Sequence, residues 1–176
     1  RARSVVGELA TEEAAKTALV LPFLGALGYD VFNPTEVVPE FTADVGMKRG
    51  EKVDYAVCVS GKPEILLECK PHGARLDNYS SQLYRYFSVT PARIAVLTDG
   101  VEYRFYSDLM EPNKLDPDPF MRGLATEPRE SVTSRLRLLS KDHLDVQSLL
   151  SAAEDMTFKA KIRRRLAEEA DAPSER

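Results

Sequence analysis

Three side chains within the stretch Lys52–Lys70 could act together on a charged substrate. Asp54 lies in one apolar, strand-like segment, and Glu68 and Lys70 lie in the next one. Because side chains two residues apart on a β-strand leave the same face, Glu68 and Lys70 are expected side by side. An acid and a base are therefore held next to each other.

The turn between these two segments decides where Asp54 lies. Residues 60–63 contain a glycine and a proline, which favour chain reversal. If the strands pair symmetrically about Gly61, Asp54 falls opposite Glu68 on the same face. Opposed carboxylates destabilise an antiparallel pair, because Cβ atoms about 4.5–5.5 Å apart bring like charges together. A divalent cation is the natural compensation.

Two carboxylates suit Mg²⁺ or Mn²⁺, which prefer oxygen ligands. Such a cation assists phosphodiester hydrolysis, and Lys70 would add a point charge at the phosphate. Zinc is not expected, because His72 and His143 are far apart in sequence and the cysteines form no C-x-x-C pair. The alternative is a solvated sheet face on which the two acids pair with Lys70 and Lys52.

Composition excludes several classes of protein. The chain has 176 residues, of which 43% are hydrophobic and 30% charged, as in an ordinary soluble globular protein. No apolar run approaches the roughly 20 residues of a membrane span, so no membrane association is expected. Cys58 and Cys69 lie in apolar runs, which favours a reduced, buried pair and a cytoplasmic location. The net charge of −4 argues against indiscriminate nucleic-acid binding but not against a local basic site.

The first expected element is a helix over residues 10–26. Thr11 is a typical N-cap and is followed by acids, which the helix dipole favours in the first turn. Gly28 is placed to end the helix, and Pro22 implies a kink or two shorter helices. Glu12 falls on the inward-facing stripe of this helix. The alternative is that Glu12 is only a capping acid in solvent.

The remaining pattern predicts an α/β protein with a mixed sheet, whose central hairpin bears the acids. Pro39 indicates an edge strand, and Asp99-Gly100 indicates a hairpin with a two-residue turn. The other expected elements are extended pieces within 29–41, a loop over 42–51, a helix over 78–87, strands over 93–98 and 102–106, a loop or linker after Ser107, and helices from about 129 and over 146–166.

Asp54, followed on the next strand by Glu68 and Lys70, resembles the PD-(D/E)xK nuclease signature, although Val53 stands in place of the proline. Residues 12–120 more specifically resemble the N-terminal endonuclease domain of the restriction (motor) subunit of type I restriction enzymes and its stand-alone relatives. The resembling phrases are TEEAAKTALVLPFLGALGYDVFNP, EVVPEFTADVG, EKVDYAV, ILLECK, SQLYRYF and RIAVLTDGVEYRFYSDL.

This resemblance implies a restriction-endonuclease-like core over residues 1–120, with a mixed central sheet of about four strands flanked by helices. Residues 121–176 would form a helical extension packed on the core or trailing it. The implied activity is metal-dependent DNA cleavage. The implied partners are DNA and other restriction-modification subunits or motor domains. The alternative is a non-catalytic module on the same fold that binds nucleic acid or a partner protein.

The resemblance also implies roles for single residues. Asp54 and Glu68 would be ligands of Mg²⁺ or Mn²⁺, and Lys70 would contact the scissile phosphate and the attacking water. An acid on the first helix often joins the metal site in this family, and Glu12 fits best, with Glu13 as the second choice.

Gln82 and Tyr86 match the Gln-x-x-x-Tyr pattern of RecB-like nucleases, in which the pair helps to position the lysine and DNA. Both residues could equally be surface residues of the helix over 78–87. Four basic residues could contact phosphates or could be solvated charges: Lys48, Arg49, Arg75 and Arg85. A protein that serves only as a structural partner would instead expose apolar residues on the helix over 146–166.

Overall fold

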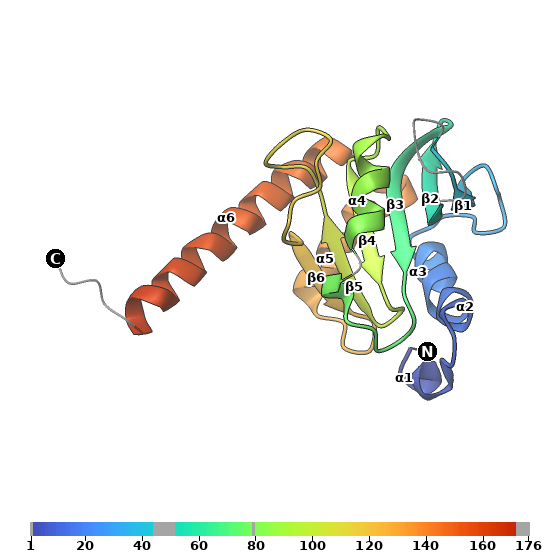
Figure 1. Cartoon of the computed structure of the whole chain (residues 1–176), viewed down its shortest axis with the longest axis horizontal. Helices are drawn as coiled ribbons and strands as arrows, with labels where there is room; N and C mark the ends of the chain where they lie inside the picture. Colours follow the sequence, from blue (N-terminus) through green and yellow to red (C-terminus); the bar gives the residue numbers. More distant parts are fainter. Residues whose placement is uncertain (1, 44–51, 79, 172–176) are drawn as a thin grey trace.

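Six strands form one mixed sheet in a computed structural model of the chain, which describes residues 2–43, 52–78 and 80–171. The strand order follows the sequence (Figure 1). Strands β3 and β4 are parallel, and every other neighbouring pair is antiparallel. The strands are β1 (Val37–Phe41), β2 (Val53–Val59), β3 (Lys62–Cys69), β4 (Ile94–Thr98), β5 (Glu102–Tyr106) and β6 (Met121–Leu124).

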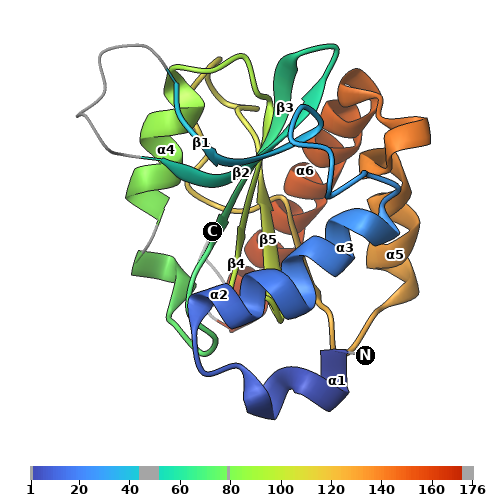
Figure 2. The same cartoon turned by 90° about the vertical axis from the view of Figure 1, so that its right-hand side faces the viewer.

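Helices cover both faces of the sheet (Figure 2). One face carries η3 (Leu76–Asn78) and α4 (Ser80–Ser88). The other face carries α2 (Glu12–Ala15), η2 (Lys16–Val20), α3 (Leu21–Ala26), α5 (Glu130–Leu136), η4 (Arg137–Leu139) and the start of α6 (Val146–Asp171). The short elements α1 (Ala2–Val5), η1 (Val6–Glu8) and η5 (Lys141–His143) complete the order. The predicted α/β, restriction-endonuclease-like class is confirmed, with a larger sheet than the predicted four strands.

Alternation along β3 divides the core into two clusters. Ile65, Leu67 and Cys69 join the cluster under the N- and C-terminal helices. Leu66 joins the cluster under α4, together with Leu83 and other residues of that helix. Glu68 follows Leu66 by two residues, so it leaves the sheet on the α4 side.

The first long helix is interrupted where the sequence predicted a kink. Thr11 caps it by accepting a hydrogen bond from the Ala14 amide at 3.0 Å. The helix then widens into the π-helical segment η2, in which the Leu21 amide donates to the Lys16 carbonyl. Pro22 has no amide hydrogen and its ring crowds the preceding turn, so the wide turn precedes it.

The two edge strands had different sequence signals. β1, which contains Pro39, lies at one edge of the sheet as predicted. β6 lies at the other edge, where the sequence predicted only a loop or linker, and this prediction was wrong for residues 121–124. β6 has four residues, MRGL, in which apolar and polar residue types do not alternate, so the sequence carried no strand signal there. The division of the chain near residue 120 stays a prediction.

The hairpin at Asp99-Gly100 is confirmed, but its connection has three residues and not two. β4 ends at Thr98 and β5 begins at Glu102. The Asp99 carboxylate accepts hydrogen bonds from the amides of Val101 at 2.9 Å and Glu102 at 2.8 Å. These bonds stabilise the three-residue turn. The alternation of residue types in the sequence gives no sign of this third turn residue.

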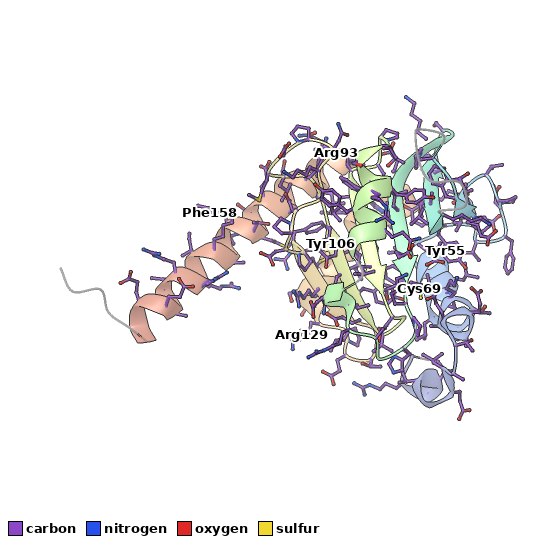
Figure 3. All side chains as sticks on the ribbon, viewed as in Figure 1. Tyr55, Cys69, Arg93, Tyr106, Arg129 and Phe158 are labelled. Carbon is purple, nitrogen blue, oxygen red and sulfur yellow. The ribbon has the colours of Figure 1, made fainter. Side chains whose placement is uncertain are left out.

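The C-terminal helix α6 leaves the body of the protein. Its first turns are buried through Leu149, Leu150 and Ala153. The helix then projects away from the sheet (Figure 1), and Phe158 lies on the projecting part (Figure 3). Phe158 and Leu166 are 64% and 66% exposed. No helix within the described ranges is long and apolar enough to cross a membrane.

Candidate active site

The tip of the β2–β3 hairpin is a tight turn. Val59 pairs with Lys62, so only Ser60 and Gly61 connect the strands. Both have positive φ angles, 52° and 76°, as a type I′ hairpin turn requires. The turn is therefore shorter than the four residues that the sequence suggested.

A bulge on β3 then restores the register that a turn centred on Gly61 predicts. Val57 pairs with Ile65 but Cys58 pairs with Pro63, which leaves Glu64 as the extra residue. Beyond the bulge, Tyr55 pairs with Leu67, and the next step sets Asp54 opposite Glu68. A one-residue slip would send one of these acids to the other face of the sheet. The predicted register is confirmed as far as the Tyr55–Leu67 pair, and its continuation by one residue brings the two acids together.

Both oxygens of Asp54 are engaged at the open end of this hairpin. Oδ2 accepts a hydrogen bond of 2.7 Å from the Cys69 amide on β3. Oδ1 accepts a hydrogen bond of 2.8 Å from Lys16 Nζ. The Asp54 amide in turn donates to Glu68 Oε2 at 3.4 Å. The two acidic residues are thus tied to each other through backbone groups.

Glu68 is buried, with 2% of its surface exposed. Its Oε1 lies 2.6 Å from Lys70 Nζ. Burial, and after it the negative charge of Asp54, raises the pKa of Glu68 to about 7 in spite of this ion pair. The charge of Asp54 therefore opposes the ionisation of Glu68, as expected when like charges meet in a poorly solvated site.

Lys70 carries its charge in the same site. Burial is the largest single influence and lowers the pKa of Lys70, but the hydrogen bond to Glu68 and the charges of the nearby acids together outweigh burial, so this pKa is raised. Its backbone amide donates to the Thr98 carbonyl on β4 at 2.8 Å. Lys70 thus follows the end of β3 at a fixed place and remains an ammonium at neutral pH.

Lys16 is a site residue that the sequence reasoning missed. It follows Glu12 and Glu13 by one helical turn and forms ion pairs with both, at 3.5 Å in the case of Glu12. Its bond to Asp54 lowers the cost of placing its ammonium there: burial opposes the charge, but the bonds to Asp54 and Glu13 outweigh burial and raise the pKa of Lys16. The helical spacing predicts the pairs with the two glutamates, whereas no local pattern predicts the contact with a strand 38 residues away.

The two helix acids differ in exposure. The Glu12 side chain is 32% exposed and that of Glu13 is 76% exposed. The more inward position of Glu12 agrees with the predicted stripe. Both acids reach Asp54 only through the shared ammonium of Lys16 in the contacts described here.

Gln82 and Tyr86 lie on α4 in different environments. Gln82 Nε2 donates a hydrogen bond to the carbonyl of Lys52, the residue before β2. Tyr86 is fully buried in the cluster under α4, so the alternative that it is a surface residue of the helix was wrong. Gln82 therefore connects α4 to the strand that carries Asp54.

The basic residues considered as phosphate contacts are only partly described. Arg75 and Arg85 are exposed. Lys48 and Arg49 lie outside the described residues. Their part in binding stays a prediction.

A cavity of about 340 Å³ opens beside Asp54 between β1, β2 and the first helix. It is lined by Glu13, Lys16, Pro39, Glu40, Lys52, Val53, Asp54 and Tyr55. Most of these side chains are charged. Tyr55 and Cys69 indicate the position of the hairpin next to the first helix (Figure 3).

The carboxylate oxygens at the hairpin are the type of ligand that Mg²⁺ and Mn²⁺ prefer. Within residues 2–43, 52–78 and 80–171, no group of three or more His, Cys, Asp or Glu side chains is arranged to hold a metal ion. Mg²⁺ commonly takes one or two carboxylates and completes its shell with water and substrate phosphates, which Asp54 and Glu68 satisfy. Burial raises the pKa of the Cys69 thiol to about 12, so this neighbour offers no thiolate.

The fold and the hairpin place the protein in the restriction-endonuclease-like class of α/β folds. Residues 44–114 match the family model described as "Type I restriction enzyme R protein N terminus". The predicted resemblance is thereby confirmed over less than half of the chain. The matched segment includes Asp54, Glu68 and Lys70, whereas the first helix with Lys16 lies outside it. Comparisons with curated proteins and with solved structures gave no match.

Proposed function

We propose that this chain is a metal-dependent DNA endonuclease domain related to the N terminus of the type I restriction R protein. The observation that carries the proposal is the tie between β2 and β3, in which the Cys69 amide donates to Asp54 at 2.7 Å. This bond holds Asp54 beside the strand end that bears Glu68 and Lys70. The family match over residues 44–114 supports the same reading.

In the proposed reaction Asp54 and Glu68 hold the divalent cation. A bound Mg²⁺ or Mn²⁺ would supply charge neutralisation and Lewis acidity for phosphodiester hydrolysis. Lys70 remains charged and would neutralise the scissile phosphate and orient the attacking water. Glu12 is proposed to complete the site from the first helix, with Glu13 as the alternative.

Gln82 and Tyr86 are proposed to support the site from α4. Gln82 holds the backbone at Lys52, two residues before Asp54, and so would fix the start of β2. Tyr86 packs beneath the same helix. Both are treated as positioning residues, because Gln82 bonds to the Lys52 carbonyl and Tyr86 is buried in the cluster under α4.

Metal binding by calorimetry tests the proposal directly. We expect Mg²⁺ or Mn²⁺ to bind the purified chain and expect Glu68→Gln to abolish this binding while the chain stays folded. The type I enzymes that the chain resembles cut DNA as motor complexes, so cleavage by the isolated chain is a second readout. Cleavage of supercoiled or linear DNA should require the metal and should be lost in Asp54→Asn and Lys70→Met.

A chain that binds neither metal and cuts no DNA would contradict the proposal. Cleavage that persists in EDTA, or that Asp54→Asn leaves unchanged, would contradict it equally. Circular dichroism of each variant controls for loss of the fold.

The projecting half of α6 favours a second candidate function, binding to a partner protein. Phe158, Ile162 and Leu166 recur at four-residue intervals and are 64%, 43% and 66% exposed, which makes one apolar stripe on the helix. Such a stripe would suit another restriction-modification subunit or a motor domain. A non-catalytic module predicts this binding without any dependence on Mg²⁺.

We also propose a cytoplasmic location. Cys58 and Cys69 are both free and buried, and free thiols persist in reducing compartments.

A further inference from the structure

Lys16 places its ammonium on the carboxylate oxygen that a metal ion would need. Its Nζ lies 2.8 Å from Asp54 Oδ1, and its side chain is only 12% exposed. The other oxygen of Asp54 accepts the Cys69 amide at 2.7 Å. Oδ1 is thus the Asp54 oxygen that is not bound to the β3 backbone, and we take it as the oxygen that the cation uses.

Two cations cannot share this oxygen at low cost. Charges of the same sign repel strongly in a partly buried site, where water screens them poorly. Lys16 must consequently move when a divalent cation binds. Its ammonium sits at the end of a flexible four-carbon stem, so it can move without the helix moving.

Glu13 provides the place to which the ammonium can move. It already forms an ion pair with Lys16, and its side chain is 76% exposed and lines the cavity beside Asp54. An ammonium that stays with Glu13 and leaves Asp54 keeps a partner and gains solvent. Lys16 thus has partners on two elements, Asp54 on β2 and the acids Glu12 and Glu13 on its own helical turn.

We propose that Lys16 is the resident counter-ion of Asp54 and is exchanged for the divalent cation, with Glu13 receiving the released ammonium. Lys16 is then a positioning residue: it neutralises Asp54 and holds it in place while the metal is absent, and it competes with the metal for Oδ1. This inference rests on the proposed metal-dependent function.

Calorimetry with MnCl₂ or MgCl₂ on the whole chain, without DNA, tests the exchange. Lys16→Met removes the ammonium but keeps the apolar stem, and we expect it to bind the metal about tenfold more tightly than the wild type. Lys16→Arg keeps the charge and should bind about as weakly as the wild type. In EDTA, Lys16→Met should melt at a lower temperature than the wild type, and the added metal should raise its Tm by more.

Lys52→Met is the matched control, because Lys52 lines the same cavity but pairs with Glu40 at 2.8 Å and not with Asp54. We expect its metal affinity to stay within about twofold of the wild type. An equal gain in metal affinity in Lys52→Met and Lys16→Met would mean that the gain comes only from the lost positive charge. That result would overturn the exchange.

Glu13→Gln gives a second test on an exposed side chain, where loss of the fold is not expected. Without Glu13 the ammonium keeps Asp54 and only the longer pair with Glu12 at 3.5 Å, so the metal should bind about threefold to tenfold more weakly. In the Lys16→Met background the same substitution should change the metal affinity by less than about twofold, because no ammonium competes there, whereas an equal loss would mean that Glu13 is a metal ligand. Glu40→Gln removes an equally exposed acid from the same cavity, at 73% exposure, and should have a smaller effect.

The outcomes separate this inference from the proposed function. Metal binding by the wild type that Lys16→Met leaves unchanged or weakens would overturn the exchange but leave the endonuclease proposal standing. Binding that appears only in Lys16→Met would support the exchange. Absence of binding in the wild type and in all variants would overturn both.

Discussion

The Cys69 amide donates a hydrogen bond of 2.7 Å to Asp54 Oδ2, and this bond fixes the strand end that carries both neighbours of Cys69. Asp54 thus has a structural task in addition to the proposed metal binding. A substitution that removes the charge of Asp54 can either keep or remove the acceptor of the Cys69 amide. The effect on stability can therefore be measured separately from the effect on metal binding.

Asp54→Ala should be less stable than Asp54→Asn by about 1–2 kcal/mol, because a buried amide that loses its acceptor keeps the cost of desolvation. Asparagine retains one carbonyl oxygen for the Cys69 amide, and both variants lack the charge. Urea unfolding in EDTA measures the difference. Equal free energies of unfolding would mean that this bond adds nothing to stability.

The raised pKa of Glu68 predicts a pH dependence of stability. In the folded protein its pKa is about 7, against an ordinary value of 4.5. Between these values the folded state binds more protons than the unfolded state, so stability falls as pH rises through this window. Above the folded pKa the ionised, buried carboxylate costs about 1–3 kcal/mol.

Glu68→Gln should remove the fall in stability that the ionisation of Glu68 causes as pH rises. In EDTA the variant should gain stability relative to the wild type when the pH rises from about 4 to about 8. Urea unfolding of both proteins at several pH values checks this, and the difference between them cancels the titration of the other carboxylates. A difference that is constant with pH, or that runs in the opposite direction, would mean that Glu68 ionises freely.

Gly100 should be required for the contact between the β4–β5 turn and the first helix. Its φ is +87°, and a Cβ there would lie 3.3 Å from Ala15 Cβ and 3.3 Å from Leu19 Cδ1. Gly100→Ala therefore combines backbone strain with overpacking beside Lys16, and we expect a loss of about 2–4 kcal/mol.

Gly61→Ala is the matched control for this effect. Its φ is +76°, but nothing lies within 4 Å of the added Cβ, so only the backbone cost of about 1 kcal/mol applies. Thermal unfolding of both variants compares the two positions. Similar losses of stability in the two variants would mean that the β4–β5 turn accommodates the added methyl group without a clash with the first helix.

Local patterns predicted the hairpin and its acids, because alternation and turn residues act over a few positions. The register at Asp54 was right although the turn was shorter than expected, since the extra residue Glu64 on β3 compensates for it. The bulge itself has no signature in the sequence. Lys16 was missed for a different reason: its contact with Asp54 depends on how the first helix crosses the end of the sheet.

The C-terminal helix α6 shows the same limit of local patterns. Its apolar residues form one helical pattern in the sequence, yet Leu150 is 5% exposed and Phe158 is 64% exposed. Periodicity identifies the apolar face of a helix but not where the sheet beneath it ends.

This difference in exposure predicts a large loss of stability for one side-chain truncation on α6 and a negligible loss for another. Leu150→Ala removes packed methyl groups and should cost about 2–4 kcal/mol. Phe158→Ala should change the free energy of unfolding by less than about 0.5 kcal/mol, because little of its ring is packed. Urea unfolding at pH 7 compares them. A loss above about 1 kcal/mol in Phe158→Ala would indicate that the projecting half packs against the body in solution, and its stripe would then be core and not a surface for a partner.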